Sequence, residues 1–160
     1  MILLSTINFS CSSYTKIYCG TNKETVRLVP KKNPFEYDFK ENNKNISLIV
    51  SMLQKLIDKA EISVSDKSLI KQQIEQLNQS NITYNQTLRA AYTALVLNPC
   101  SEKAFDKYME LLNNKDTQRV KLEELQTGLN RVIETNGLGG TNPDEAISLI
   151  QKYLNTKNEK

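Results

Sequence analysis

The apolar residues after position 45 recur at three- and four-residue intervals, the spacing that places them on one face of an α-helix. The clearest run places Ile46, Ile49 and Leu53 on a single face. Polar clusters and Pro99 interrupt the spacing and divide it into about six segments. The pattern therefore predicts a mainly α protein, a compact bundle or helical-hairpin array. We expect its helices at residues 46–57, 63–80, 81–98, 101–112, 116–135 and 143–154.

Four residues mark helix ends more strongly than the spacing alone. Pro99 stops a helix, and Ser101 is a suitable N-cap for the next one. Asn142 followed by Pro143 is a strong helix start, because Asn caps and Pro fits the first turn. The last helix is therefore expected to begin at these two residues.

The first 45 residues follow a different pattern, which predicts extended structure. Residues 16–18 and 25–29 are short β-like runs, and Gly20 and Asn22 between them are typical of a turn. We therefore expect an amino-terminal extended or β-hairpin-like segment ahead of the helices. The predicted domain boundaries are an arm at 11–45, a helical domain at 46–156 and a frayed tail at 157–160.

Three aromatic residues, Phe35, Tyr37 and Phe39, alternate with Glu36 and Asp38. Alternation is typical of an extended segment with one apolar face. The first interpretation is an arm that packs on the helical body. The alternative is an aromatic recognition strip, in which Phe35, Tyr37 and Phe39 contact a protein partner.

The chain opens with the apolar run MILLSTINF, which Ser10, Cys11, Ser12 and Ser13 follow. This opening resembles the end of a bacterial lipoprotein signal peptide, in which an apolar stretch leads to a cysteine that becomes lipidated. The resemblance implies that residues 1–10 are a signal-peptide remnant, that Cys11 carries lipid, and that the protein lies in the cell envelope. The alternative is a cytoplasmic protein, in which residues 2–9 form a first strand or a buried tail and Cys11 is an ordinary small apolar residue.

The other two cysteines, Cys19 and Cys100, depend on the same choice. In an oxidising compartment they could form a disulfide, and their spacing neither supports nor excludes it. In a cytoplasmic protein they would be thiols. No CxxC pair is present and the chain contains no His, so we expect no metal site and no cofactor.

Apolar residues of several sizes stand on both sides of Pro99: Ala94, Leu95 and Leu97 before it, and Ala104, Phe105, Tyr108 and Leu112 after it. The arrangement resembles the junction between two tetratricopeptide repeats. The 34-residue period does not recur, because Lys121 and Gly128 occupy positions where small packing residues are expected. The alternative is a generic helical hairpin with a proline stop.

Charge and composition exclude several functions. The net charge is +3, and Lys and Arg outnumber Asp and Glu seven to four in residues 1–45, whereas the remainder holds fourteen of each. No basic face is predicted on the helices, so nucleic-acid binding is not expected. The absence of His excludes Ser-His-Asp and Cys-His catalysis. We therefore predict a non-enzymatic helical interaction module with a protein partner, attached to a membrane through lipid on Cys11. The alternative is a cytoplasmic adaptor without lipid.

Overall fold

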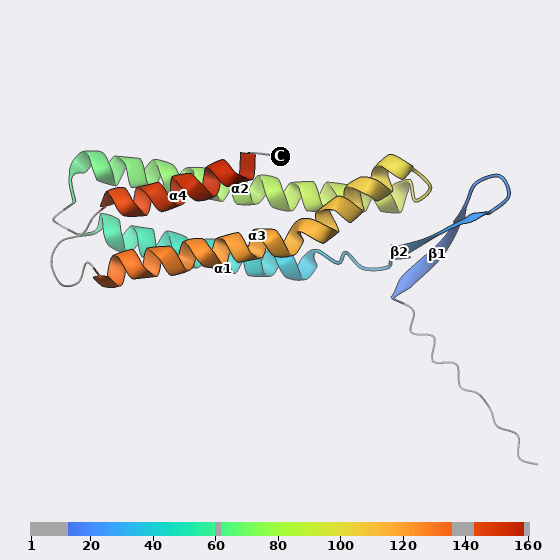
Figure 1. Cartoon of the computed structure of the whole chain (residues 1–160), viewed down its shortest axis with the longest axis horizontal. Coiled ribbons are helices and arrows are strands. Elements are labelled where there is room, and N and C mark those ends of the chain that lie inside the picture. The colour runs from blue at the N-terminus through green and yellow to red at the C-terminus, as the bar shows by residue number, and fades with distance from the viewer. Residues whose placement is uncertain (1–12, 60–61, 136–142, 159–160) are drawn as a thin grey trace, which may run out of the picture.

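The computed structural model describes residues 13–59, 62–135 and 143–158, which form one β-hairpin and four helices (Figure 1). The hairpin lies at one end of an elongated helical bundle. The mainly α fold and the amino-terminal hairpin agree with the sequence pattern, whereas the helices are fewer and longer than predicted.

The hairpin consists of β1 (Tyr14–Cys19) and β2 (Thr25–Pro30), which pair antiparallel with Tyr14 opposite Pro30 and Cys19 opposite Thr25. The turn between them uses two residues with positive φ, Gly20 at 90° and Lys23 at 57°. Glycine reaches this region without steric cost. The backbone N–H of Lys23 donates to the carbonyl of Gly20 at 3.2 Å and closes the turn.

The four helices are α1 (Glu36–Ile57), α2 (Val64–Leu97), α3 (Glu102–Thr135) and α4 (Pro143–Asn158). The prediction of about six helices was wrong, because α2 and α3 each continue through a polar cluster that was interpreted as a break. Asn81 and Asp116 lie inside helices instead of beginning them. Packing of one face over 34 residues outweighs the weak helix propensity of a few Ser, Asn and Asp residues.

The first helix also begins earlier than predicted, at Glu36 instead of Ile46. Asn33 lies just before it and accepts the backbone N–H of Phe35 at 3.1 Å on its side-chain oxygen. This start corrects the predicted boundary between the arm at 11–45 and the helical domain at 46–156. Other predicted ends agree with the structure: Ser63 and Ser101 accept N–H groups of the first turns of α2 and α3, and α4 begins at Pro143.

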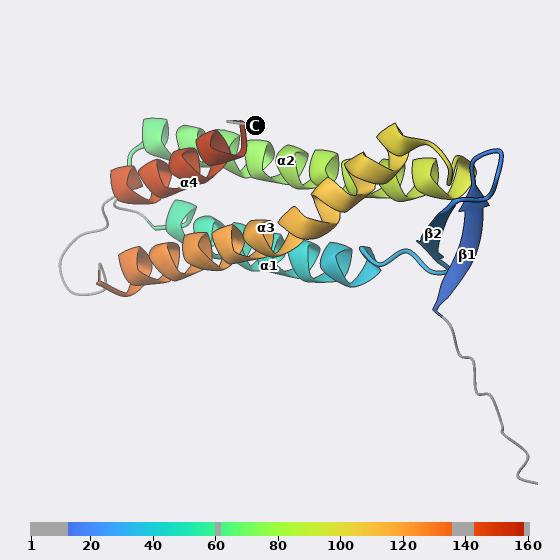
Figure 2. The same ribbon diagram turned by 45° about the vertical axis from the view of Figure 1, so that its right-hand side comes forward.

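The two long helices, α2 and α3, form the centre of the bundle. Helix α1 packs against both of them, and α4 also packs against both, beside the first half of α2 (Figures 1 and 2). At Gly128 the α3 backbone approaches α4 closely, since a Cβ atom there would lie 3.1 Å from Cδ1 of Leu149.

The core positions of the helices follow the spacing of coiled coils, alternating steps of three and four residues. On α1 this series runs from Phe39 through Asn42 and Ile46 to Ile49, and on α3 it runs through Leu111 and Gln118 to Leu129. The buried apolar side chains form two clusters. One lies around Leu53, Leu77, Leu129 and Ile150, and the other lies nearer the hairpin around Phe35, Leu88, Leu95 and Tyr108.

Candidate functional site

A layer of polar side chains lies between the two apolar clusters. We call it the polar layer and define it by Asn42 of α1, Asn81 of α2, Gln118 of α3 and the hydroxyl of Tyr153 of α4. The first three residues are 4%, 9% and 8% exposed, respectively. Each helix therefore contributes one polar group at a position where the coiled-coil spacing would otherwise place an apolar residue.

Hydrogen bonds join neighbouring helices at this level. The Nε2 atom of Gln118 donates to the hydroxyl of Tyr153, which links α3 to α4. The Oδ1 atom of Asn43 accepts from Nδ2 of Asn81 at 2.7 Å and from Nδ2 of Asn85 at 3.1 Å, which links α1 to α2.

A partly buried ion pair completes the links at this level. Nζ of Lys115 lies 3.4 Å from Oδ2 of the buried Asp38, and this contact links α3 to α1. Together with the amide hydrogen bonds, it satisfies polar groups that would be costly to bury alone.

A groove of about 860 Å³ opens beside the polar layer, between α2 and α3 and next to the last turns of α4. We call it the α2–α3 groove. Most of its lining consists of neutral hydrogen-bonding groups. Lys107 and Glu110, which also line it, form an ion pair within α3 at 2.9 Å. Its lining from α2 includes Gln76, Gln79, Ser80, Thr83, Tyr84 and Thr87, and its lining from α3 includes Asn114, Thr117, Gln118 and Lys121.

Two tyrosines at this level are held in the neutral form. The pKa of Tyr84 is raised to about 12, chiefly by burial and also by the negative charges of Asp38 and Asp116. Burial also raises the pKa of Tyr153, against the hydrogen bond from Gln118. Tyr84 therefore presents a neutral phenol to the groove at physiological pH, a group that both donates and accepts hydrogen bonds.

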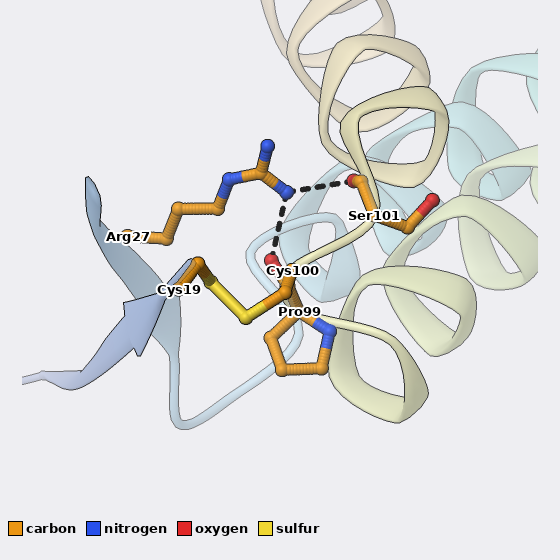
Figure 3. Close-up of a disulfide and its surroundings, with 5 residues drawn as sticks. All are labelled: Cys19, Arg27, Pro99, Cys100 and Ser101. Carbon is orange, nitrogen blue, oxygen red and sulfur yellow. Dashed lines mark hydrogen bonds between the residues drawn. A yellow bond between two sulfur atoms is a disulfide. The ribbon is translucent and has the colours of Figure 1, made fainter. Parts of the chain in front are cut away.

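The β-hairpin is attached to the helices by a disulfide and by Arg27 (Figure 3). Cys19 at the end of β1 is bonded to Cys100 in the turn between α2 and α3, with Cα atoms 5.3 Å apart. The guanidinium of Arg27 donates to the carbonyls of Pro99 at 2.9 Å and Ser101 at 2.7 Å. It also lies 4.8 Å from the centre of the Phe105 ring, within the range of cation–π contacts.

Alternation along the strands gives the hairpin two different faces. One face carries Cys19, Arg27 and Val29 toward the helices. The opposite face, which we call the hairpin face, carries the exposed side chains of Tyr14, Lys16, Tyr18, Val26 and Leu28. Its tyrosine, valine and leucine side chains are 50% to 58% exposed.

The structure separates the three aromatic residues for which a partner-contact strip was the alternative interpretation. Phe35 and Phe39 are 0% and 3% exposed and pack in the cluster nearer the hairpin, and Phe35 meets Tyr108 edge-on at 5.7 Å between ring centres. Only Tyr37 is exposed, at 63%. The alternative of an aromatic recognition strip is therefore wrong, because in a helix residues 35 and 39 share a face and residue 37 lies on the other side.

The predicted pair Cys19 and Cys100 is joined in the structure, although its spacing left the question open. The predicted lipidation site, Cys11, and the predicted signal remnant at residues 1–10 lie outside the described residues.

The polar layer and the α2–α3 groove were not predicted from the sequence. Gln118 and Asn81 each continue an apolar series at its regular spacing, and that regularity is the signal that could have placed them in the core. The hairpin face could have been found from the alternation of Tyr14, Lys16 and Tyr18 once the strand was recognised.

None of the helices in the described part of the chain is long and apolar enough to span a membrane. Within residues 13–59, 62–135 and 143–158, no three Cys, Asp or Glu side chains gather in a way that would hold a metal ion. Comparisons of the chain with protein-family models, with curated proteins and with solved structures found no match.

Proposed function

We propose that the protein is a non-enzymatic helical interaction module of a bacterial cell envelope, held at a membrane by lipid on Cys11. The observation that carries the proposal is the disulfide between Cys19 and Cys100. Such bonds form and persist in oxidising compartments, and they are rare where cellular thiols are kept reduced. The lipoprotein-like opening of the sequence supports the same location.

The hairpin would connect a lipid on Cys11 to the helical bundle. Tyr14 begins β1 three positions after Cys11, so a lipid on Cys11 would hold the hairpin, and the disulfide and Arg27 would transmit that hold to the helices. The helical body then needs no membrane-spanning segment of its own.

The α2–α3 groove is the surface that we propose for a protein partner. Its amides, hydroxyls and neutral phenol offer donors and acceptors to a polar segment of a partner, whereas its lysines and single glutamate give little net charge. Polar surfaces of this kind form interfaces with many hydrogen bonds and bridging waters.

The lipid anchor is tested by the mass of the mature amino-terminal peptide. The gene is expressed with its own upstream region in its own host, and the membrane and soluble fractions are analysed separately. We expect a peptide that begins at Cys11 and carries diacylglycerol in the membrane fraction, with Cys19 and Cys100 protected from alkylation until a reductant is added. A Cys11→Ser chain is the matched control and should leave the membrane fraction. An unmodified peptide from Met1 in the soluble fraction would refute the anchor.

The partner surface is tested by photo-crosslinking in intact cells. A photoreactive side chain at Thr83, in the groove, is expected to trap one protein as a product of defined mass, because a partner seated there lies against this position. The same side chain at Val64, which is 85% exposed and lies at the start of α2, is the control. The groove is not the partner site if both positions give the same products, or if Thr83 gives none.

A further inference from the structure

The hairpin face combines apolar, aromatic and basic side chains in one small area. The strand register places Tyr18 opposite Val26 and Lys16 opposite Leu28, so the four apolar side chains surround one lysine. Single exposed apolar residues are ordinary on protein surfaces, whereas several that lie together mark a contact surface. The reverse face of the hairpin is occupied by the disulfide and Arg27, so Tyr18, Val26 and Leu28 point away from the helices.

The charge around the hairpin face is positive. Residues 13–34 contain five Lys and Arg residues and one acidic residue, Glu24. Arg27 is engaged with the carbonyls of Pro99 and Ser101, but Lys16, Lys23, Lys31 and Lys32 are all exposed. Basic side chains near an anionic lipid surface each contribute to binding, and the tyrosine ring suits the boundary between headgroups and acyl chains.

The hairpin face also lies close to the proposed lipid attachment. Only two residues separate Cys11 from Tyr14, and each extended residue spans at most about 3.6 Å, so about 11 Å of chain joins the two. Lys31 lies beside the same point, because its backbone N–H donates to the carbonyl of Ser13 at 3.0 Å. A lipid on Cys11 would therefore keep the hairpin at the membrane surface, without a long linker to carry it away.

We propose that the hairpin face is a membrane-contact surface that seats Tyr14, Tyr18, Val26 and Leu28 among the headgroups of an anionic bilayer. The inference rests on the lipid anchor proposed for Cys11, which brings the face to the surface. The contact adds a second attachment to the membrane beside the diacylglycerol proposed for Cys11. It also fixes the side of the molecule that faces the bilayer.

The contact is measured with a tryptophan at position 18. The chain contains no Trp, so the full-length Tyr18→Trp protein reports on the hairpin face alone. It is coupled through the Cys11 thiol to vesicles of phosphatidylcholine and phosphatidylglycerol that contain a maleimide lipid and brominated acyl chains. Cys11 is the one cysteine outside the disulfide, so the chemical anchor attaches there. Because this anchor replaces the biological one, the hairpin is tested separately from lipidation in the cell.

We expect the emission of the tryptophan at position 18 to shift to shorter wavelength and to be quenched several-fold more strongly than that of the matched Val64→Trp protein. Val64 lies at the opposite end of α2 from the hairpin, and both proteins carry the same anchor and the same first twelve residues. Lys16→Gln and Lys23→Gln should each weaken the contact by about fivefold on these vesicles. Lys67→Gln and Lys71→Gln on α2 should leave it unchanged.

Equal quenching at positions 18 and 64 would overturn the inference. A shift at position 18 that appears without vesicles and grows with protein concentration would also overturn it, because a second copy of the chain would then cover the face. If the coupled protein is quenched as expected but Cys11 carries no lipid in cells, the proposed anchor fails and the membrane affinity of the hairpin face stands.

Discussion

Replacement of both Cys19 and Cys100 by Ser is expected to lower the free energy of unfolding by about 4.5 kcal/mol in the chain-entropy account of disulfides. The bond joins residues 81 positions apart, so it restricts a large part of the unfolded chain. A two-stranded hairpin is only marginally stable by itself, and the bond secures it to the turn between α2 and α3. This attachment is the feature on which the proposed location depends.

The measurement is urea unfolding followed by circular dichroism, with every protein in a Cys11→Ser background to prevent disulfide exchange. The reduced parent should match the Cys19→Ser, Cys100→Ser variant, because both lack the same bond. A difference below about 1 kcal/mol between the oxidised parent and the variant would contradict the expectation, since native disulfides of this kind typically contribute 2 to 5 kcal/mol.

Phe35→Ala is expected to lower the free energy of unfolding by about 3 to 5 kcal/mol, the usual cost of deleting a buried aromatic ring. Phe35 is fully buried and meets Tyr108 edge-on in the cluster nearer the hairpin. The surrounding side chains cannot fill the space that the ring leaves without moving a helix, because the cluster joins α1, α2 and α3.

Tyr37→Ala is the matched control, because this aromatic residue lies two positions away and is 63% exposed. Tyr37→Ala should change the free energy of unfolding by no more than about 0.5 kcal/mol, as for most surface substitutions. The same urea experiment measures both. Comparable losses for the two variants would mean that residues 35–39 form an extended strip after all, and that the helical start at Glu36 is incorrect.

The aromatic residues at positions 35 to 39 also show what could be predicted from the sequence and what could not. Within five residues, Phe35, Tyr37 and Phe39 alternate as in a strand, and only the longer series through Asn42 and Ile46 indicates a helix. The polar residue at position 42 conceals that series, because a core position is expected to be apolar. The strands, the stop at Pro99 and the start at Pro143 rest on local backbone chemistry and were predictable.

The helix count and the disulfide depend on contacts between distant segments. Asn81 and Asp116 favour a break locally, and only packing along the whole of α2 and α3 carries the helices through them. Cys19 and Cys100 meet because the hairpin folds back on the turn between α2 and α3, an approach that no local pattern encodes. The α2–α3 groove likewise exists because α4 runs beside only part of α2, which depends on how the helices pack.

The polar layer also fixes the positions of the helices along one another. Coiled-coil spacing repeats every seven residues, so a helix could slide by one repeat and still present a regular apolar series. Such a slip would place Gln118 or Asn81 against leucines without its partner, at a cost of about 1 to 3 kcal/mol for each buried amide left unsatisfied. The layer therefore selects one alignment among near-equivalent ones. The hydrogen bond from Gln118 to Tyr153 fixes where α4 lies along α3, and with it the end of the groove.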